Sequence, residues 1–343
     1  MKLLEILKKG QTYIVAEMSA NHAGSIDNAL EIVMEAKQAG ADCLKIQTYT
    51  ADTLTIDCKS DYFKIKGGLW GNQYLHDLYR QAETPWEWQK TIKEKCDEIG
   101  IDFLSTPFDK TSIDFLCEMG VGAIKIASFE IVDIPLLSYA ASKGKTMIIS
   151  CGMASFEEIN EAIAACVKEG NKDIILMKCC SGYPADLENM NLVTITDMIS
   201  RFNLPVGISD HSLGFIAAIV GCSLGACIIE KHFRLDNGET TPDSNFSMSP
   251  AEFSEMVKQV RMAEKSKGKI FYGVSLGEEE STVFRRSIFA IENISKGDLF
   301  SEENVRIIRP GYGLKPKYYT DLMGHTSSRD ICRGEPIILS DME

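Results

Sequence analysis

The sequence has no apolar segment long enough to cross a membrane. Of its 343 residues, 45% are apolar and 25% are charged, which is the balance of an ordinary soluble protein. No stretch approaches the roughly 20 uninterrupted apolar residues that a spanning helix needs. The N-terminal apolar run contains Glu5 and is too short for the core of a signal peptide. These features predict a cytoplasmic protein.

Positive charge is also scarce. There are 36 Lys and Arg against 49 Asp and Glu, so the formal net charge is −13. Nucleic-acid binding depends on Lys and Arg side chains that neutralise phosphates, and we therefore expect no nucleic-acid partner. A small anionic ligand stays possible, because a pocket can be locally positive in an acidic protein.

Paired cysteine motifs are missing as well. The eleven cysteines are scattered singly, apart from Cys179-Cys180, and no CxxC spacing occurs. This pattern indicates neither a structural zinc site nor a disulfide framework. No glycine-rich phosphate loop follows the first apolar run, which argues against the alternative of a doubly wound open sheet.

What the sequence does contain is a series of eight short apolar runs rich in β-branched residues. Amphipathic patterns such as DNALEIVMEAKQAGA separate most of them. Apolar runs that alternate with helices predict parallel strands covered on the outside, and eight such units predict an α/β fold of the (β/α)8 TIM-barrel type. The runs cover residues 12–20, 42–49, 102–108, 123–129, 146–153, 173–180, 205–211 and 226–233.

Polar side chains end each of these runs. In a (β/α)8 barrel, the catalytic groups lie at the C-terminal ends of the strands. We therefore expect one polar pocket to be formed by Glu17, Lys45, Gln47, Thr106, Lys125, Ser128, Ser150, Ser181, Tyr183, Ser209, Asp210, His211, Glu230 and His232.

Two of these side chains, His211 and His232, end the seventh and eighth runs, which are neighbours in a barrel. Two imidazoles can hold a divalent metal ion, with water or substrate in its other positions. Mn²⁺, Fe²⁺, Co²⁺ and Zn²⁺ all suit such ligands, and geometry alone does not choose among them. Because strand neighbours alternate in direction, Glu230 should share the side of His232 and belong with the metal site. Lys231 should face the helical layer.

Lys45 and Lys125 interrupt runs that are otherwise apolar. A lysine inside a buried strand is seldom left unpaired, and a phosphate or carboxylate is a natural partner. A Schiff-base lysine is the alternative, although a metal can polarise a carbonyl without one. Glu17 is expected to accept a hydroxyl proton, to bind a sugar hydroxyl, or to pair with a barrel lysine. Hydroxyl groups for the same anion are expected from Thr106, Ser128, Ser150 and Ser209.

The C-terminal part of the sequence changes character. A helix with a capping box at Ser249 and Glu252 follows the eighth unit. Residues 292–305 are then echoed by residues 329–342, each with an apolar residue two positions before a basic-Gly-acidic turn. We therefore predict three segments: a catalytic barrel (residues 1–268), a linker (residues 269–284) and a small β-rich module (residues 285–343).

In their order along the chain, several motifs resemble the sialic acid synthase family. They are IVAEMSANHAG, KIQTYTADTLT, STPFD, KIASFE, SGYPADLENMNL, GISDHSLG, EKHFRLD and IRPGYGL. The likeness covers nearly the whole chain. It implies a barrel with a C-terminal antifreeze-like (SAF, β-clip) domain. It also implies a transferase that joins phosphoenolpyruvate to an N-acetylated sugar by a carbon–carbon bond and releases phosphate.

Finer features are most similar to the branch that makes pseudaminic acid. They are NHAG, IQTYTADTLT, FKIKGGLWGNQYLHDLY and DSNFSM. Ser244 follows Pro242-Asp243 where many neuraminate synthases have His, and Ser181 replaces a frequent Asn. The implied sugar is 2,4-diacetamido-2,4,6-trideoxy-L-altrose, whose C6 methyl would suit a loop with Leu69 and Trp70. A neuraminate or legionaminate synthase, a Schiff-base aldolase and a non-catalytic sugar-binding protein stay as alternatives.

The resemblance also implies roles for individual residues. His211 and His232 match metal ligands, and Glu17 matches a residue beside the reacting aldehyde. Arg309 matches an arginine that the SAF domain of one subunit inserts into the barrel of the other, which implies a domain-swapped homodimer. Phosphoenolpyruvate is expected at Lys45, Thr106, Lys125, Ser128, Ser150, Ser181 and Ser209. Gln47 is a further substrate-binding position, and Tyr183, Asp210 and Asp243 match positions that either contact the sugar or lie just behind the residues that do.

Overall fold

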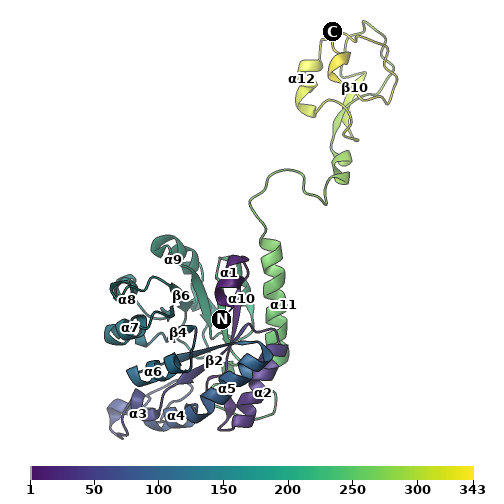
Figure 1. Cartoon of the computed structure of the whole chain (residues 1–343). Coiled ribbons are helices and arrows are strands. Elements are labelled where there is room, and N and C mark those ends of the chain that lie inside the picture. The colour runs from purple at the N-terminus through teal and green to yellow at the C-terminus, as the bar shows by residue number, and fades with distance from the viewer. Residues whose placement is uncertain (1) are drawn as a thin grey trace. The chain divides into compact units, whose positions relative to one another are not determined.

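Eight parallel strands form the centre of the N-terminal part of the chain in this computed structural model, which describes residues 2–343 (Figure 1). Each predicted run contains one strand, so the eightfold prediction is confirmed. Their hydrogen-bonded order is β3-β2-β1-β8-β7-β6-β5-β4, and β3 also packs against β4, which closes the ring of a (β/α)8 barrel. The strands are β1 (Tyr13–Glu17), β2 (Cys43–Thr48), β3 (Asp102–Pro107), β4 (Ala123–Ile126), β5 (Thr146–Ser150), β6 (Ile174–Cys179), β7 (Val206–Asp210) and β8 (Ile228–His232).

Helices connect successive strands and surround the barrel (Figure 1). The predicted capping box is confirmed at the last of them, where Ser249 accepts from the Glu252 amide and Glu252 accepts from the Ser249 amide. No helix in residues 2–343 is both long and apolar enough to span a membrane. The helices are α1 (Leu3–Lys8), α2 (Ile26–Gln38), α3 (Ala51–Leu54), α4 (Leu75–Ala82), α5 (Trp86–Ile99), α6 (Lys110–Glu118), α7 (Ile134–Ala141), α8 (Phe156–Lys168), α9 (Thr194–Phe202), α10 (Ile216–Ser223) and α11 (Pro250–Lys267).

Strand alternation separates the barrel into an interior and an outer layer. Ile14 of β1 belongs to the large core between strands and helices, whereas Tyr13 and Val15 belong to a smaller cluster inside the barrel. Leu3 of α1 joins that inner cluster, so apolar side chains fill the N-terminal half of the barrel. Toward the C-terminal strand ends the inward positions carry polar side chains that line a cavity, as with Glu17. This arrangement places the polar groups at one mouth.

The C-terminal part forms a second compact unit, Lys269–Glu343, described here by itself. Strand β9 (Ser287–Ala290) pairs antiparallel with β10 (Val305–Ile308), and helix α12 covers Tyr319–Leu322. The predicted linker, residues 269–284, falls within this unit, and its linker role stays a prediction.

The sequence repeat in this second unit has a structural counterpart. Ile294 and Ile331 exchange two backbone hydrogen bonds of 2.8 Å, so the two repeats pair with each other. In the turns that follow, Gly297 and Gly334 both have φ of 90°, a conformation that side chains disfavour. The repeated glycine is therefore required by the repeated turn.

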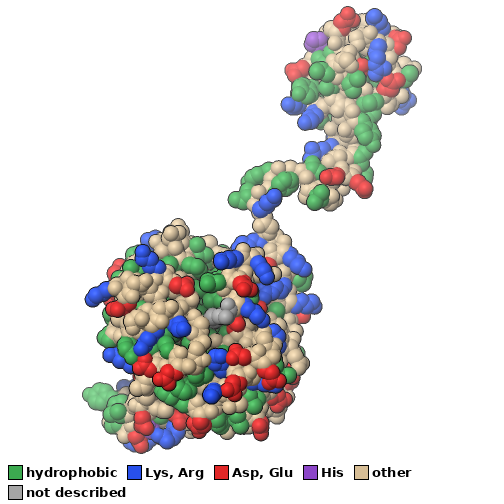
Figure 2. Space-filling model, in the orientation of Figure 1, with side chains coloured by type: hydrophobic (Ala, Val, Ile, Leu, Met, Phe, Trp, Pro, Cys, Tyr) green, Lys and Arg blue, Asp and Glu red, His purple; other side chains and the backbone are tan. Residues whose placement is uncertain are grey.

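Surface charge is mixed on the face shown in Figure 2, where Lys and Arg lie among Asp and Glu on both units. This mixture agrees with the acidic but interspersed composition of the sequence.

Candidate active site

A cavity of about 480 Å³ opens at the C-terminal ends of the barrel strands. Nearly all of the predicted pocket residues line it, and they come from all eight strands or the segments that follow them. Asp210 and Arg309 are the exceptions. The predicted residues in the lining are Glu17, Lys45, Gln47, Thr106, Lys125, Ser128, Ser150, Ser181, Tyr183, Ser209, His211, His232 and Asp243, and Glu230 joins them.

Glu230 is the centre of a charged network at the base of the cavity. Its Oε1 atom lies 3.1 Å from Lys125 Nζ and 3.5 Å from Lys45 Nζ, and it accepts a 3.1 Å hydrogen bond from Ser209. All these side chains are buried. Its observed partners are the two lysines that reach across the barrel interior, and its place with the metal site stays a prediction.

Electrostatics differ among the members of this network. Burial opposes the charge of Glu230, but Lys125 and Lys45 outweigh burial and lower its pKa. Burial raises the pKa of Glu17, although Lys45 contacts it. Burial also lowers the pKa of Lys125, whereas its two acidic neighbours raise that of Lys45. Lys45 also donates to Thr106 Oγ1 at 3.2 Å. The cavity base thus holds a charge-balanced set in which Lys45 is the more firmly charged cation.

Hydroxyl groups stand beside this network on the next strands. Ser150 Oγ is buried and has no hydrogen-bond partner among residues 2–343, which is an expensive state for a buried polar group. Ser128 and Ser181 lie 3.0 Å apart. Gly152 makes room for them, since a Cβ there would lie 2.5 Å from Ser128 Cβ and 2.7 Å from Ser181 Oγ. Two lysines beside a serine hydroxyl that has no partner in the described chain are the groups that an oxyanion ligand needs.

The two histidines face each other at the same mouth, with ring centroids 5.4 Å apart. His211 Nδ1 lies 3.1 Å from the Cys180 carbonyl oxygen. A carbonyl only accepts, so Nδ1 carries the proton and Nε2 keeps a lone pair. His232 Nδ1 is buried without a hydrogen bond in the described chain and lies 3.7 Å from Asp243 Oδ2.

Both histidines are neutral in this environment. Burial lowers the pKa of His211 to about 4 and lowers that of His232 well below its ordinary value. Neutral imidazole is the form that binds metals. The orphaned nitrogen of His232 and the fixed tautomer of His211 therefore fit a divalent ion, with Asp243 close enough to support it.

Asp210 requires a correction, because it was expected in the substrate pocket. Its carboxylate points to the outer face of the barrel, where Oδ2 lies 2.8 Å from Lys231 Nζ. The prediction that Lys231 faces the helical layer is confirmed by this contact. Strand alternation explains both results, since Ser209 and Glu230 take the inward positions of the same two strands.

Arg309 lies in the second unit, immediately after β10, and is exposed. Its predicted insertion into a barrel stays a prediction.

One side of the cavity is apolar and comes from the segment between β2 and α5. Trp70 lines it as expected and donates to the Pro242 carbonyl at 3.1 Å. Leu69 does not line it and is 40% exposed. Phe246 contacts Trp70, Tyr183 and both histidines. The rest of this apolar wall comprises Leu54, Ile65, Leu75, Leu78, Tyr79 and Ala82.

Glu130 is a lining residue that sequence reasoning missed. It lies in the short 3-10 helix after β4, Oε2 is buried without a hydrogen-bond partner among residues 2–343, and burial raises its pKa to about 7. A carboxyl group with one buried oxygen that has no partner in the described chain is a candidate for contact with substrate. Glu130 follows the end of β4 in the stretch KIASFE, and this position could have indicated that its side chain lines the mouth of the barrel.

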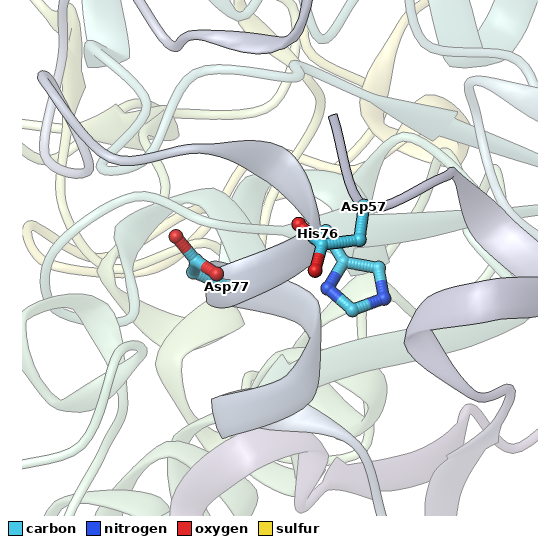
Figure 3. Close-up of side chains that lie close together, drawn as sticks. All are labelled: Asp57, His76 and Asp77. Atoms are coloured by element: carbon cyan, nitrogen blue, oxygen red, sulfur yellow. The ribbon is translucent and has the colours of Figure 1, made fainter. Parts of the chain in front are cut away.

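A second group of possible metal ligands lies on the segment that carries the apolar wall. Asp57, His76 and Asp77 approach one another within 4.8 Å (Figure 3). However, Lys59 Nζ lies 2.6 Å from Asp77 and 3.3 Å from Asp57, and His76 Nε2 lies 2.9 Å from Asp52. A lysine thus already provides the positive charge, and these contacts join α3, the following loop and α4.

Comparisons with known proteins agree with this geometry. Residues 32–272 match the model of the NeuB family, and residues 285–343 match that of the SAF domain. A pseudaminic acid synthase of Campylobacter jejuni is 44% identical over 331 residues, covering 96% of each chain. One of Helicobacter pylori is 37% identical over 340 residues, covering 96% of this chain and 97% of the relative. The solved structure of N-acetylneuraminic acid synthetase from Leptospira borgpetersenii, in complex with citrate, matches with a TM-score of 0.71 and 31% identity, over 79% of this chain and 90% of that one.

Proposed function

We propose that this chain, which belongs to the NeuB family, is a pseudaminic acid synthase. It would condense phosphoenolpyruvate with 2,4-diacetamido-2,4,6-trideoxy-L-altrose and water to give pseudaminic acid and phosphate. The observation that carries the proposal is one cavity in which Lys45, Lys125 and the unpartnered Ser150 stand beside two neutral histidines. Relatives that bear this activity cover nearly the whole chain.

Phosphoenolpyruvate needs cationic and hydroxyl groups for its phosphate and carboxylate. Lys45 and Lys125 would provide the cations. The Ser150 hydroxyl, which has no hydrogen-bond partner within residues 2–343, would gain one from the ligand. Ser128 and Ser181, whose hydroxyls lie 3.0 Å apart, would donate to the same anion. Thr106, Ser209 and Gln47 complete the polar lining on this side.

His211 and His232 would hold a divalent ion, Mn²⁺ in our proposal, with Mg²⁺, Co²⁺, Fe²⁺ or Zn²⁺ as alternatives. When bound, that ion polarises the carbonyl of the open-chain sugar. The histidines, Tyr183 and Phe246 would orient the sugar and exclude water from the reacting carbon. Asp243, 3.7 Å from His232, would support the histidine or a sugar hydroxyl.

The reaction forms one carbon–carbon bond and one carbon–oxygen bond to water, and it breaks the carbon–oxygen bond to phosphate. C3 of phosphoenolpyruvate attacks the aldehyde carbon, and water adds to C2. The C2–O bond then breaks and phosphate leaves with the bridging oxygen. Water loses both of its protons in the overall reaction: one reaches the aldehyde oxygen, and the other leaves the C2 hydroxyl as the C2 carbonyl forms and goes to the departing phosphate. Glu17, buried beside Lys45 at the end of β1, is the group that we propose to carry a proton between these positions.

The apolar wall supports the choice of sugar. A sugar with two acetamido groups and a C6 methyl presents more apolar surface than one with hydroxyls at these positions. Side chains such as Leu54, Leu75 and Leu78 would cover that surface. From the family resemblance we also propose a domain-swapped homodimer, in which the partner subunit's Arg309 reaches the sugar.

A substrate panel tests the function. The enzyme, Mn²⁺ and phosphoenolpyruvate are incubated with the diacetamido altrose and with the sugar precursors of neuraminic and legionaminic acids, and phosphate and product mass are measured. Phosphate release with the altrose and the mass of pseudaminic acid is the expected result. With ¹⁸O in the bridging position of phosphoenolpyruvate, the label should appear in phosphate. A lysine adduct trapped by borohydride with pyruvate would instead favour an aldolase.

A further inference from the structure

A sealed ion pair lies directly behind the two histidines. Asp210 and Lys231 are register partners on β7 and β8, and both side chains are fully buried on the outer face of the barrel. Their Nζ–Oδ2 distance is 2.8 Å. Taking two charges out of water is costly, and an apolar pair of similar size often gives equal or greater stability. Stability alone therefore gives little reason for this pair.

The same pair fixes the residue that follows His211. Asp210 Oδ1 accepts from both the Ser212 amide, at 2.8 Å, and the Ser212 hydroxyl, at 2.6 Å. Lys231 Nζ donates to the Ser212 carbonyl oxygen. Ser212 is thus held through its donor amide, its hydroxyl and its carbonyl. His211 lies between a strand residue on one side and this fixed serine on the other.

His232 directly follows Lys231 in β8, so the ion pair adjoins both histidines along the chain. We infer that the Lys231–Asp210 pair is a positioning pair, which sets the spacing and direction of His211 and His232 for a divalent cation. Neither Lys231 nor Asp210 lines the cavity, so both would act through the histidines. This inference rests on the proposed function, specifically on its metal site.

Cation affinity in uncharged variants tests the inference. Lys231→Met/Asp210→Leu removes both charges together and leaves no unpaired buried ion. The Mn²⁺ dissociation constant, measured by calorimetric titration, should rise about 10- to 100-fold, which is the typical loss of affinity when a group that supports a metal ligand is removed. Lys231→Met/Asp210→Asn keeps an acceptor for Ser212 and should recover part of the affinity. Thr48→Val/Ser105→Ala is the matched control, because it removes a buried 2.6 Å contact on the outer face of β2 and β3. It should leave the Mn²⁺ affinity unchanged.

A spectroscopic readout on the metal-free protein complements the titration. The chain has five histidines, so their ¹⁵N ring signals can be assigned by single substitution. In the unaltered protein His211 should show a protonated Nδ1, because it lies against the Cys180 carbonyl. In Lys231→Met/Asp210→Leu we expect a mixture of tautomers, which a loss of stability alone would not produce.

The possible outcomes separate the two proposals. Unchanged Mn²⁺ affinity and an unchanged His211 tautomer in folded Lys231→Met/Asp210→Leu would overturn the positioning role while leaving the proposed function intact. Failure of both double variants to fold would also overturn it, because the pair would then be a requirement of the fold. If the unaltered protein binds no Mn²⁺, Mg²⁺, Co²⁺, Fe²⁺ or Zn²⁺, the metal site falls and this inference falls with it.

Discussion

Removing the charge of Glu230 should destabilise the ligand-free enzyme. It should also increase the thermal stabilisation that the enzyme gains from phosphoenolpyruvate. Glu230→Gln keeps the shape of the side chain and an oxygen that accepts from Ser209. It leaves Lys45 and Lys125 in the barrel interior with Glu17 as the remaining acid. The charged set at the cavity base then changes from balanced to positive.

The distances give the magnitude. At 3.1 and 3.5 Å from the two lysine nitrogens, each attraction is about 5 kcal/mol at an effective dielectric constant of about 20. Desolvation of the charges offsets most of this gain, and removal of one partner from a buried pair costs about 3–5 kcal/mol. For a domain of this size the melting temperature should fall by about 10 °C.

Thermal unfolding with and without phosphoenolpyruvate measures both effects. The ligand's negative charge would replace the lost carboxylate, so saturating phosphoenolpyruvate should raise the melting temperature of Glu230→Gln more than that of the unaltered enzyme. Asp197→Asn, which breaks an exposed ion pair with Arg201, is the control and should change stability by about 0.5 kcal/mol or less. Equal ligand-induced shifts in the variant and the unaltered enzyme would refute the assignment of the anion to these lysines.

The remaining predictions concern single residues with proposed roles in substrate or metal binding. Ser150→Ala should keep or raise the melting temperature, because it removes a buried hydroxyl that has no partner in the described chain. The KM for phosphoenolpyruvate should rise about 10-fold or more, which is the cost of one hydrogen bond to a charged ligand, and an unchanged KM would contradict its role. EDTA should abolish turnover, and added Mn²⁺ should restore it. His232→Ala should stay folded but be inactive with any of the candidate ions. Full activity of this variant would show that His232 is not a metal ligand. Arg309→Ala should raise the KM for the sugar more than that for phosphoenolpyruvate, and equal KM values in variant and unaltered enzyme would count against insertion of this side chain. Leu75→Asn should lower kcat/KM for the diacetamido altrose without changing the KM for phosphoenolpyruvate, and a uniform loss for both substrates would indicate general damage.

The barrel could be predicted because its strands carry their own signal. Buried parallel strands need apolar residues on both faces, so runs such as residues 146–153 and 226–233 are visible without any partner. Helix boundaries were visible where capping chemistry marks them, as at Ser249. The position of the second unit's repeat was visible because the same turn requires the same glycine twice, at Gly297 and Gly334.

For the site, strand alternation in the sequence predicts only whether each side chain faces the barrel interior or the outer layer. Alternation correctly separated Glu230 and His232 from Lys231, but it does not say which long side chain reaches Glu230 from across the barrel. The lysines of β2 and β4 do so, and no local pattern records a contact between residues so far apart in sequence. The same rule, applied to Asp210, would have placed it outside the pocket, because its neighbour Ser209 faces inward.

Lining residues outside the strands had still weaker signals. Glu130 lies in a 3-10 helix, and the apolar wall comes from residues 54–82, where short helices and loops share no single periodicity. A half-buried leucine in such a segment reads as ordinary packing until the cavity beside it is known. These residues distinguish one sugar from another in our proposal, so the exact substrate was less predictable than the reaction.

The two neighbouring residues Glu230 and Lys231 show how one strand provides two ion pairs with different consequences. Glu230 faces the cavity, so a ligand anion can reach the same lysines and compete for them. Lys231 faces the sealed outer layer, where both partners are fully buried and no ligand can enter. The inner pair should therefore respond to phosphoenolpyruvate in its stability, whereas the outer pair should respond only through the histidines that it holds. Phosphoenolpyruvate should accordingly give the Lys231→Met/Asp210→Leu enzyme no more thermal stabilisation than it gives the unaltered enzyme, in contrast to Glu230→Gln.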